Sequence, residues 1–315
     1  MSHGYEPTPA SDRRLDRRTY TVRRLGVLAA AIGVVVAVLS GVPAIFGRDD
    51  TNAVLVSSVT NTVIDDGVTP ITLTPTTTTE LPLKPLEVPS RQNPAEVLIL
   101  GDSDAGGFGP YLQQTIDQTG VATATVHSRQ SSGLARPDYF DWPTRMRELV
   151  QHENPDIVVA TFGGNDAQGL RNADKTWAVP HSPGSGHDDT DWKAEYARRV
   201  GAAMDYLSKG NRMLIWVGIP NDNNPAVTAR LEVQDGVVRA EALKRRGKVL
   251  FVDTWALFGG PNGGWAEYVV DPRDGQGKAV RRSDGFHLND VGGQILAVDI
   301  ADVVKSVLRA RGATL

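Results

Sequence analysis

The chain has 315 residues, of which 40% are hydrophobic and 22% are charged, and this composition excludes a collagen-like or wholly disordered protein. The 33 basic and 37 acidic residues give a net charge of −4, so charge indicates no nucleic-acid partner. The chain contains no cysteine, which excludes disulfides, thiolate zinc sites, iron–sulfur clusters and a cysteine nucleophile.

The first element in chain order is a basic tail followed by an apolar run. Residues 1–24 carry six arginines against three acidic residues, and residues 25–46 contain no charged residue. An apolar helix of about 20 residues crosses the hydrocarbon core of a bilayer, and basic residues beside such a helix stay on the cytoplasmic side. We therefore expect a cytoplasmic tail over 1–24, one transmembrane helix over 25–46, and an extracytoplasmic location for the rest of the chain.

A cleaved signal peptide is the competing interpretation of the apolar run. The run is longer than the usual signal-peptide core of about 7–15 residues, and Val42-Pro43-Ala44 matches a cleavage site only weakly. Length therefore favours an uncleaved anchor. The arginine pairs also suggest a twin-arginine export signal, but the residues that follow them fit that signal poorly.

Residues 47–92 are rich in threonine and proline, most clearly in the stretch TPITLTPTTTTELPLKPLEVP. Proline removes a backbone donor and favours extended conformations, and this composition cannot bury a core. We expect a disordered linker that holds the following domain away from the membrane.

Residues 93–315 are long enough for one domain with a sizeable core. The short apolar runs expected to form strands are Val97–Leu100, Val121–Val126, Ile157–Phe162, Met213–Ile219 and Val249–Val252. Helix-like stretches lie near 109–119, 142–152, 190–209, 225–246 and 290–311, the last with Asn289 or Asp290 as its N-cap. Such apolar runs are typical of parallel strands buried on both faces, so the alternation predicts right-handed βαβ units in a three-layer α/β/α sandwich.

Ligand sites of open parallel sheets lie beyond the carboxyl ends of the strands, and polar residues follow three of the predicted strands. Ser103, in Gly101-Asp102-Ser103, would stand at the start of a helix, where backbone N–H groups favour negative charge. Gly133 follows the second strand and can bring its N–H close to a ligand. Asn165, in Gly163-Gly164-Asn165-Asp166, follows the third strand and can donate its side-chain amide to an oxyanion. Alone, each residue also fits an ordinary cap, loop or turn.

Asp284-Gly285-Phe286-His287 stands just before the last predicted helix. A serine nucleophile needs a base, and the base needs an acceptor that fixes its tautomer. His287 and Asp284 can supply both groups, and His287 is the only one of the six histidines with an aspartate three positions earlier.

Taken in chain order, Gly-Asp-Ser, a glycine, Gly-x-Asn-Asp and Asp-x-x-His resemble the SGNH/GDSL hydrolase superfamily over roughly residues 96–312. The segments SSGLARPDYFDWP and DGFHLND look like the membrane-anchored, envelope-associated branch of that superfamily. The resemblance implies a flavodoxin-like fold with a five-stranded parallel sheet in the order 2-1-3-4-5. It also implies that no metal or organic cofactor is needed.

The resemblance further implies a role for each matching residue. Ser103 is the expected nucleophile, His287 the general base and Asp284 the residue that orients the base. The expected oxyanion hole consists of the Ser103 N–H, the Gly133 N–H and the Asn165 side chain. One residue departs from the signature, because Asp104 replaces the leucine of GDSL. It either disfavours an anionic substrate or only complements the helix dipole in a first turn, and the second interpretation is favoured.

A long loop, residues 171–191, follows Asn165. Its histidines and aspartates match no metal-ligand spacing, so we predict a solvated loop and no metal site. Trp177 and Trp192 are expected either to stack on a sugar ring or, by default, to pack in the fold.

A second insertion, residues 259–283, contains two short apolar runs around Asp274-Gly275 and predicts a hairpin. This hairpin would bring Arg281 and Arg282 close to the triad. These two arginines, together with Arg136, are either substrate-binding residues for an anionic glycan or simple surface charges.

We therefore expect a membrane-anchored extracytoplasmic serine esterase that acts on O-acyl esters through a Ser-His-Asp triad. Its location makes O-acetyl groups of cell-envelope glycans the favoured substrate class, with other ester substrates open. One alternative is an O-acyltransferase that uses the same triad. The other is a non-catalytic glycan-binding or scaffold domain, against which the complete set of expected catalytic residues argues.

Overall fold

The computed structural model describes residues 84–260 and 262–315, so the expected cytoplasmic tail, transmembrane helix and most of the linker lie outside the described residues. Among the helices of these two ranges, none combines the length and apolarity that a bilayer crossing requires. The described end of the linker is held by polar contacts. Lys84 Nζ lies 2.7 Å from Asp156 Oδ2, and the side-chain amide of Asn211 donates to the Lys84 carbonyl at 2.9 Å.

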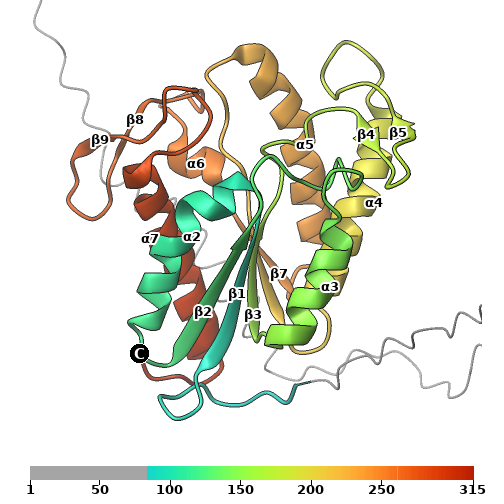
Figure 1. Ribbon diagram of the computed structural model, residues 1–315. Coiled ribbons are helices and arrows are strands. Elements are labelled where there is room, and N and C mark those ends of the chain that lie inside the picture. The colour runs from blue at the N-terminus through green and yellow to red at the C-terminus, as the bar shows by residue number, and fades with distance from the viewer. Residues whose placement is uncertain (1–83, 261) are drawn as a thin grey trace, which may run out of the picture.

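Five parallel strands form the central sheet, in the order β2-β1-β3-β6-β7 (Figure 1). The strands are β1 (Ala95–Gly101), β2 (Ala122–Ser128), β3 (Ile157–Thr161), β6 (Met213–Val217) and β7 (Val249–Val252). Each of them overlaps one of the predicted apolar runs. Counted within the sheet, the order is 2-1-3-4-5, so the predicted topology is confirmed.

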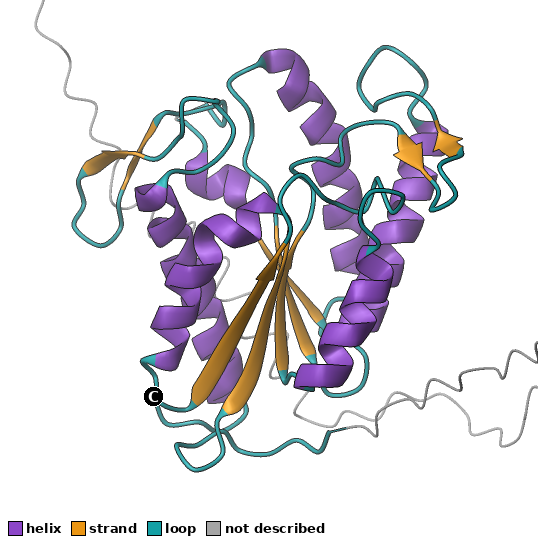
Figure 2. Ribbon diagram, viewed as in Figure 1, coloured by secondary structure: helices purple, strands orange, loops and turns teal. Residues whose placement is uncertain are grey.

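Helices cover both faces of this sheet, as Figure 2 shows. Helices α2 (Ser103–Asp117) and α7 (Asp290–Ala310) lie on one face, and α3 (Trp142–Glu153), α4 (Thr190–Leu207) and α5 (Pro225–Lys244) lie on the other. A short helix, α6 (Thr254–Phe258), follows β7. The three layers confirm the predicted α/β/α sandwich. Asn289 caps α7 by accepting from the Gly292 N–H, so it is the N-cap of the last helix.

Successive side chains of the central strands enter opposite halves of the core. Ile99, Val159 and Ile215 belong to the apolar cluster under α2 and α7. Their neighbours, including Leu98 and Val158, belong to the cluster under the other three helices. Both faces of β1, β3 and β6 are therefore buried, which explains their uninterrupted apolar runs, whereas the edge strand β2 alternates buried and exposed residues.

Helix α2 begins at Ser103, as the position of this serine after the first strand predicted, although its helical pattern becomes clear only near residue 109. Glycines have low helix propensity and hide the first turns from a pattern analysis. Here they permit close packing: a Cβ on Gly109 would lie 2.7 Å from Val126 Cγ1, and one on Gly293 would lie 2.8 Å from the Gly107 carbonyl oxygen. Tertiary contacts with β2 and α7 therefore sustain a helix that propensity alone disfavours.

The two insertions contain short antiparallel pairs. Residues 171–191 are not wholly loop, because β4 (Leu170–Arg171) pairs with β5 (Trp177–Val179). Strands β8 (Tyr268–Val270) and β9 (Gly277–Ala279) pair around Asp274-Gly275, which confirms the predicted hairpin.

Candidate active site

The nucleophile candidate stands where β1 passes into α2. Gly101 has a φ of +153°, and a Cβ there would lie 2.1 Å from the Thr161 carbonyl oxygen, so the turn requires glycine. Asp102 is fully buried and caps α2 by accepting the Asp104 N–H at 3.0 Å. Its other oxygen accepts the N–H groups that follow β3, at 3.0 Å each from Gly163 and Gly164. Asp102 therefore ties the ends of two neighbouring strands together and sets Ser103 at the first position of the helix.

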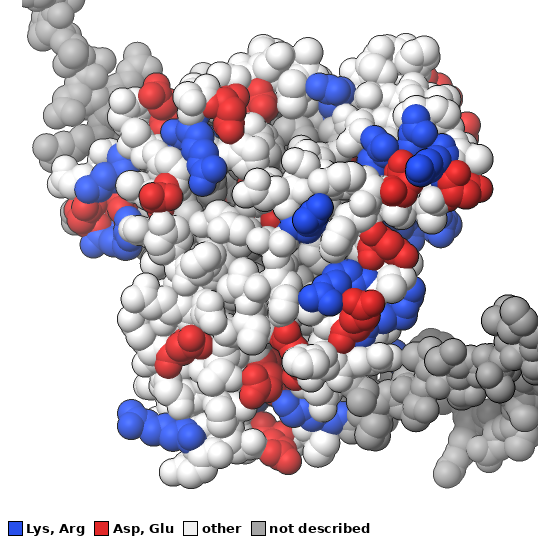
Figure 3. Space-filling view, in the orientation of Figure 1, with Lys and Arg blue, Asp and Glu red and all other residues white. Residues whose placement is uncertain are grey.

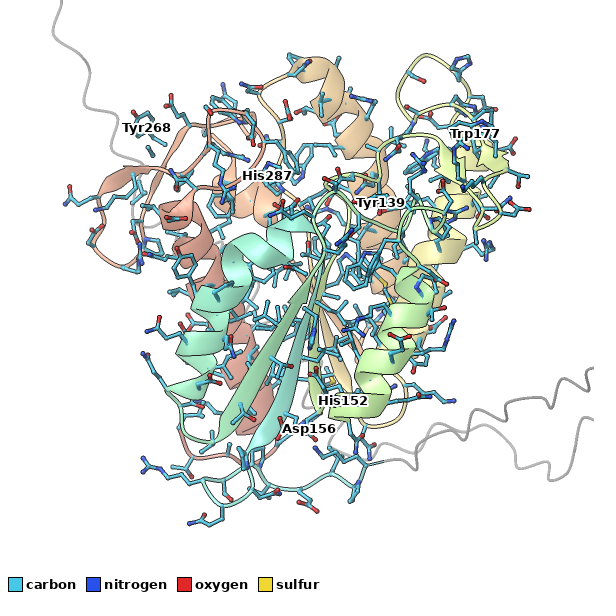
Figure 4. All side chains as sticks on the ribbon, in the orientation of Figure 1. Tyr139, His152, Asp156, Trp177, Tyr268 and His287 are labelled. Atoms are coloured by element: carbon cyan, nitrogen blue, oxygen red, sulfur yellow. The ribbon has the colours of Figure 1, made fainter. Side chains whose placement is uncertain are left out.

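The predicted triad is brought together at this edge of the sheet. Ser103 Oγ lies 3.0 Å from His287 Nε2, and His287 Nδ1 lies 2.8 Å from Asp284 Oδ2. Because Nδ1–H donates to the Asp284 carboxylate, Nε2 is left unprotonated and can accept the serine hydroxyl. Figure 4 places His287 beyond the carboxyl ends of the strands. The arrangement is that of a serine hydrolase site.

Asp284 is held ionised in the orientation that the histidine needs. Its second oxygen accepts the N–H groups of Phe286 at 3.0 Å and His287 at 2.9 Å. Burial acts to raise the pKa of Asp284, but the hydrogen bonds from the His287 ring and from these two amides outweigh it and lower the pKa.

The two other expected oxyanion donors lie on adjacent loops. Asn165 follows β3, and its side-chain amide donates to the Ser132 carbonyl at 3.2 Å, towards the loop that carries Gly133. Gly133 is buried, and a Cβ there would lie 2.0 Å from Asp166 Oδ1. The structure thus joins both loops at the site, while their roles as oxyanion donors stay a prediction.

A cleft of about 400 Å³ opens beside the nucleophile. The whole triad, Asn165 and Asp104 contribute to its lining, whereas Gly133 does not. Its apolar lining residues are Phe108, Pro220, Leu288 and Leu296, and the others are polar or glycine. The cleft therefore suits a short acyl group better than a long hydrocarbon chain.

Comparison with known proteins adds one family and a group of solved structures. The family model described as a protein of unknown function (DUF459) matches residues 96–303. The chain belongs to this family. No curated protein matches the sequence.

Several solved structures are similar to the DUF459 domain at low identity. A lipase/acylhydrolase from Enterococcus faecalis is 17% identical, with 67% of this chain and 95% of that chain covered and a TM-score of 0.46. The psychrotrophic esterase EstA from a Pseudoalteromonas species is 14% identical, with coverages of 68% and 99% and a TM-score of 0.46. The acetylxylan esterase Axe2 from Geobacillus stearothermophilus, solved as a catalytic mutant, is 15% identical, with coverages of 67% and 94% and a TM-score of 0.46. The strand order and the triad geometry of the DUF459 domain confirm its resemblance to the SGNH/GDSL superfamily.

Arg281 is neither a lining residue of the cleft nor a surface charge, so it fits neither of the two interpretations offered for it. This side chain is 7% exposed, and its guanidinium donates to the Phe286 carbonyl at 2.8 Å and to the Asn221 carbonyl at 3.0 Å. It also donates to the Asn221 side-chain oxygen at 2.9 Å. Burial lowers the pKa of Arg281 to about 10. Arg281 is instead a positioning residue, because it holds the backbone that carries the triad histidine.

The two other candidate arginines differ in their surroundings. Arg282 is exposed and lines the cleft, so it can meet a ligand. Arg136 does not line the cleft and forms a two-pronged ion pair with Asp138, at 2.8 and 2.9 Å. On the face shown in Figure 3, acidic and basic side chains of the described residues are intermixed.

Trp177 and Trp192 differ in their exposure to solvent. Trp192 is fully buried and stacks on Tyr196 in the core, so it does not contact a sugar. Trp177 is 48% exposed, with the Arg171 guanidinium 3.9 Å from its ring centroid.

Three residues that support the site were given no supporting role in the sequence analysis. Asp102 and Asp166 stand inside the recognised motifs, so the motifs themselves carried the signal. Arg281 had no such signal, because an arginine that clamps carbonyl groups looks like any other arginine in the sequence.

Proposed function

We propose that the DUF459 domain is a serine esterase that removes short O-acyl groups, with O-acetyl esters of envelope glycans as the favoured substrates. The observation that carries the proposal is the chain of contacts from Ser103 Oγ through the His287 ring to Asp284, at the mouth of a largely polar cleft. A hydroxyl, a base and an orienting carboxylate in this order generate a nucleophile at neutral pH.

In the proposed reaction, His287 Nε2 takes the Ser103 proton as Oγ attacks the ester carbonyl. The negative charge that develops on the carbonyl oxygen is stabilised by the Ser103 N–H, the Gly133 N–H and the Asn165 amide. Protonated His287 then gives its proton to the leaving alcohol as the ester C–O bond breaks. Water repeats the sequence on the acyl-serine and releases the acid. Loss of one oxyanion donor would lower turnover about 10²–10³-fold.

Membrane anchoring is the second part of the proposal, and it concerns residues outside the described ranges. Support comes from the uncharged run over 25–46 and from the place where the linker reaches the domain. Lys84 binds Asp156, which Figure 4 places at the end of the sheet opposite His287. The active site therefore opens away from the point at which the linker arrives, which suits a polymer beyond the membrane surface. Deletion of residues 1–46 should release the protein from the membrane fraction, and retention would contradict the anchor.

The esterase proposal is tested with the full chain in detergent micelles. Wild type should hydrolyse p-nitrophenyl acetate faster than p-nitrophenyl octanoate, and Ser103→Ala should lose the activity. Activity that survives in Ser103→Ala would overturn the assigned nucleophile. Acetyl transfer to an added sugar in preference to water would favour the acyltransferase, and a folded wild type with no turnover would favour a binding or scaffold domain.

A further inference from the structure

Asp104, the residue directly after Ser103, is a buried acid that the proposed reaction does not use. It lies in the first turn of α2, is 9% exposed and contributes to the lining of the cleft. Its Oδ2 atom is buried without a hydrogen-bond partner among the described residues. Buried ionisable groups are normally paired, because an unpaired carboxylate is costly to desolvate. The GDSL signature has an apolar leucine at this position, so the fold does not require an acid there.

The surroundings of Asp104 leave its charge available to a ligand. A Cβ on Gly164 would lie 3.2 Å from Asp104 Oδ2 and 3.1 Å from the Phe286 ring, so Gly164 and Phe286 enclose this oxygen, and the carboxylate meets a ligand only where Asp104 lines the cleft. Helix α7 contributes Gly293 and Leu296 to the cleft rather than a basic residue.

None of the charged side chains that influence Asp104 forms an ion pair with its carboxylate. They are Asp102, Asp284, His287, Arg281 and Arg282. The guanidinium of Arg281 is turned to the carbonyl groups described above and does not line the cleft, and Arg282 is exposed. Burial raises the pKa of Asp104 to about 6, against the opposite influence of His287 and Arg281, so the side chain is ionised above neutral pH.

We infer that Asp104 is a specificity-determining residue that selects esters bearing a cationic group near the reacting carbonyl and disfavours anionic ones. The inference deepens the proposed esterase function and rests on it for the reacting substrate. A unit charge several ångströms from a poorly solvated carboxylate should change the specificity constant by about tenfold or more. A leucine at this position would exert no such discrimination.

The test uses three acetyl thioesters with leaving groups of similar size and different charge. They are acetylthiocholine, its neutral analogue S-(3,3-dimethylbutyl) thioacetate, and S-acetyl-2-mercaptoethanesulfonate, which is anionic. The full chain in detergent micelles is assayed at pH 8, with the released thiol measured by a chromogenic disulfide. The protein has no cysteine, so it gives no background in this assay.

Wild type should have a kcat/KM at least tenfold higher for the cationic than for the neutral thioester, with the anionic one slowest. Asp104→Asn and Asp104→Leu should bring the three values within about twofold of one another. Asp290→Asn is the matched control, because Asp290 is an exposed acid in the first turn of α7, and it should keep the wild-type order. Equal rates in wild type, or an unchanged order in both Asp104 variants, would overturn the inference.

A calorimetric titration separates this inference from the esterase proposal. Choline, 3,3-dimethylbutan-1-ol and isethionate carry the same three charges without an acetyl group, so their binding requires no turnover. Choline should bind wild type at least tenfold more tightly than the neutral alcohol, and Asp104→Asn should lose that preference.

If choline is preferred while no thioester is hydrolysed, the esterase proposal fails and the role of Asp104 stands. If Ser103-dependent hydrolysis occurs without any charge preference, the inference about Asp104 fails alone. A variant that does not fold is replaced by wild type at pH 4.5, where the choline preference should fall towards one.

Discussion

Asp166 occupies the space that a side chain at position 133 would need, since a Cβ on Gly133 would lie 2.0 Å from Asp166 Oδ1. The same buried carboxylate accepts the N–H groups of Leu134 at 2.9 Å and Ala135 at 2.8 Å, and the hydroxyl of Tyr196 at 2.9 Å. A residue that follows β3 therefore fixes the backbone of the loop that follows β2. This is the loop in which one of the expected oxyanion donors lies.

Substitution of Gly133 should therefore damage both activity and fold. In Gly133→Ala the new methyl group collides with Asp166, whose bonds to Leu134 and Ala135 must then lengthen. We expect kcat to fall at least 100-fold through displacement of an oxyanion donor, and the melting temperature to fall as well. Both quantities are measured on the same sample with p-nitrophenyl acetate and by thermal unfolding.

Gly236→Ala is the control for the glycine substitution. Gly236 lies in α5, where a Cβ would meet no atom within 4 Å. Alanine there should leave activity unchanged and stabilise the fold by about 0.5–1 kcal/mol, because glycine is unfavourable inside a helix. Equal behaviour of the two variants would contradict the role assigned to the contact between Gly133 and Asp166.

Asp284→Asn tests the proposed role of Asp284 in orienting His287. The amide keeps the size of the side chain but cannot serve His287 Nδ1–H as the carboxylate does. The ring then presents the wrong tautomer to Ser103. We expect kcat to fall about 10²–10⁴-fold with little change in KM, as measured by steady-state kinetics. A loss confined to KM would instead assign Asp284 to substrate binding.

Arg281→Lys tests the clamp behind the triad loop. Lysine keeps the positive charge but cannot match the planar set of donors that reaches Asn221 and the Phe286 carbonyl together. Buried acceptors are then left unpaired, which should cost about 2–3 kcal/mol of unfolding free energy and lower kcat. Arg282→Gln changes the exposed neighbour and should leave the unfolding free energy unchanged. An Arg281→Lys variant as stable as wild type would show that the clamp is dispensable.

The sequence predicted the sheet well because burial on both faces leaves uninterrupted apolar runs. It predicted the grouping of Ser103 with His287 because parallel strands end at one edge, and because both residues lie in recognisable motifs. The helical pattern of α2 is visible only from about residue 109, because glycines weaken it over the first turns, although contacts with β2 and α7 keep that segment helical.

The arginines show what a sequence pattern cannot resolve. Arg281 and Arg282 are adjacent and identical in chemistry, yet one is buried against carbonyl groups and the other is exposed at the cleft. Arg281 forms a β-bridge with Leu288, and adjacent residues of such an extended segment point to opposite sides. This bridge exists only once the chain has folded. The sequence likewise could not decide whether Trp192 binds a sugar or packs in the core, because the burial of Trp192 depends on how α4 packs.

The pH dependence of stability gives an independent check on Asp104. Burial raises its pKa from 3.8 to about 6, so the folded protein binds this proton more tightly than the unfolded chain does. Ionisation of Asp104 therefore destabilises the fold above about pH 6, and the penalty disappears as the pH falls towards 4. Asp104→Asn removes the charge and keeps the shape. At pH 8 the variant should be more stable than wild type by about 2–3 kcal/mol, and the two should converge near pH 4. Denaturant unfolding of both proteins between pH 4 and pH 8 measures the difference. A constant difference across this range would mean that the carboxylate is not the source of the penalty, and that Asp104 is solvated or paired in solution.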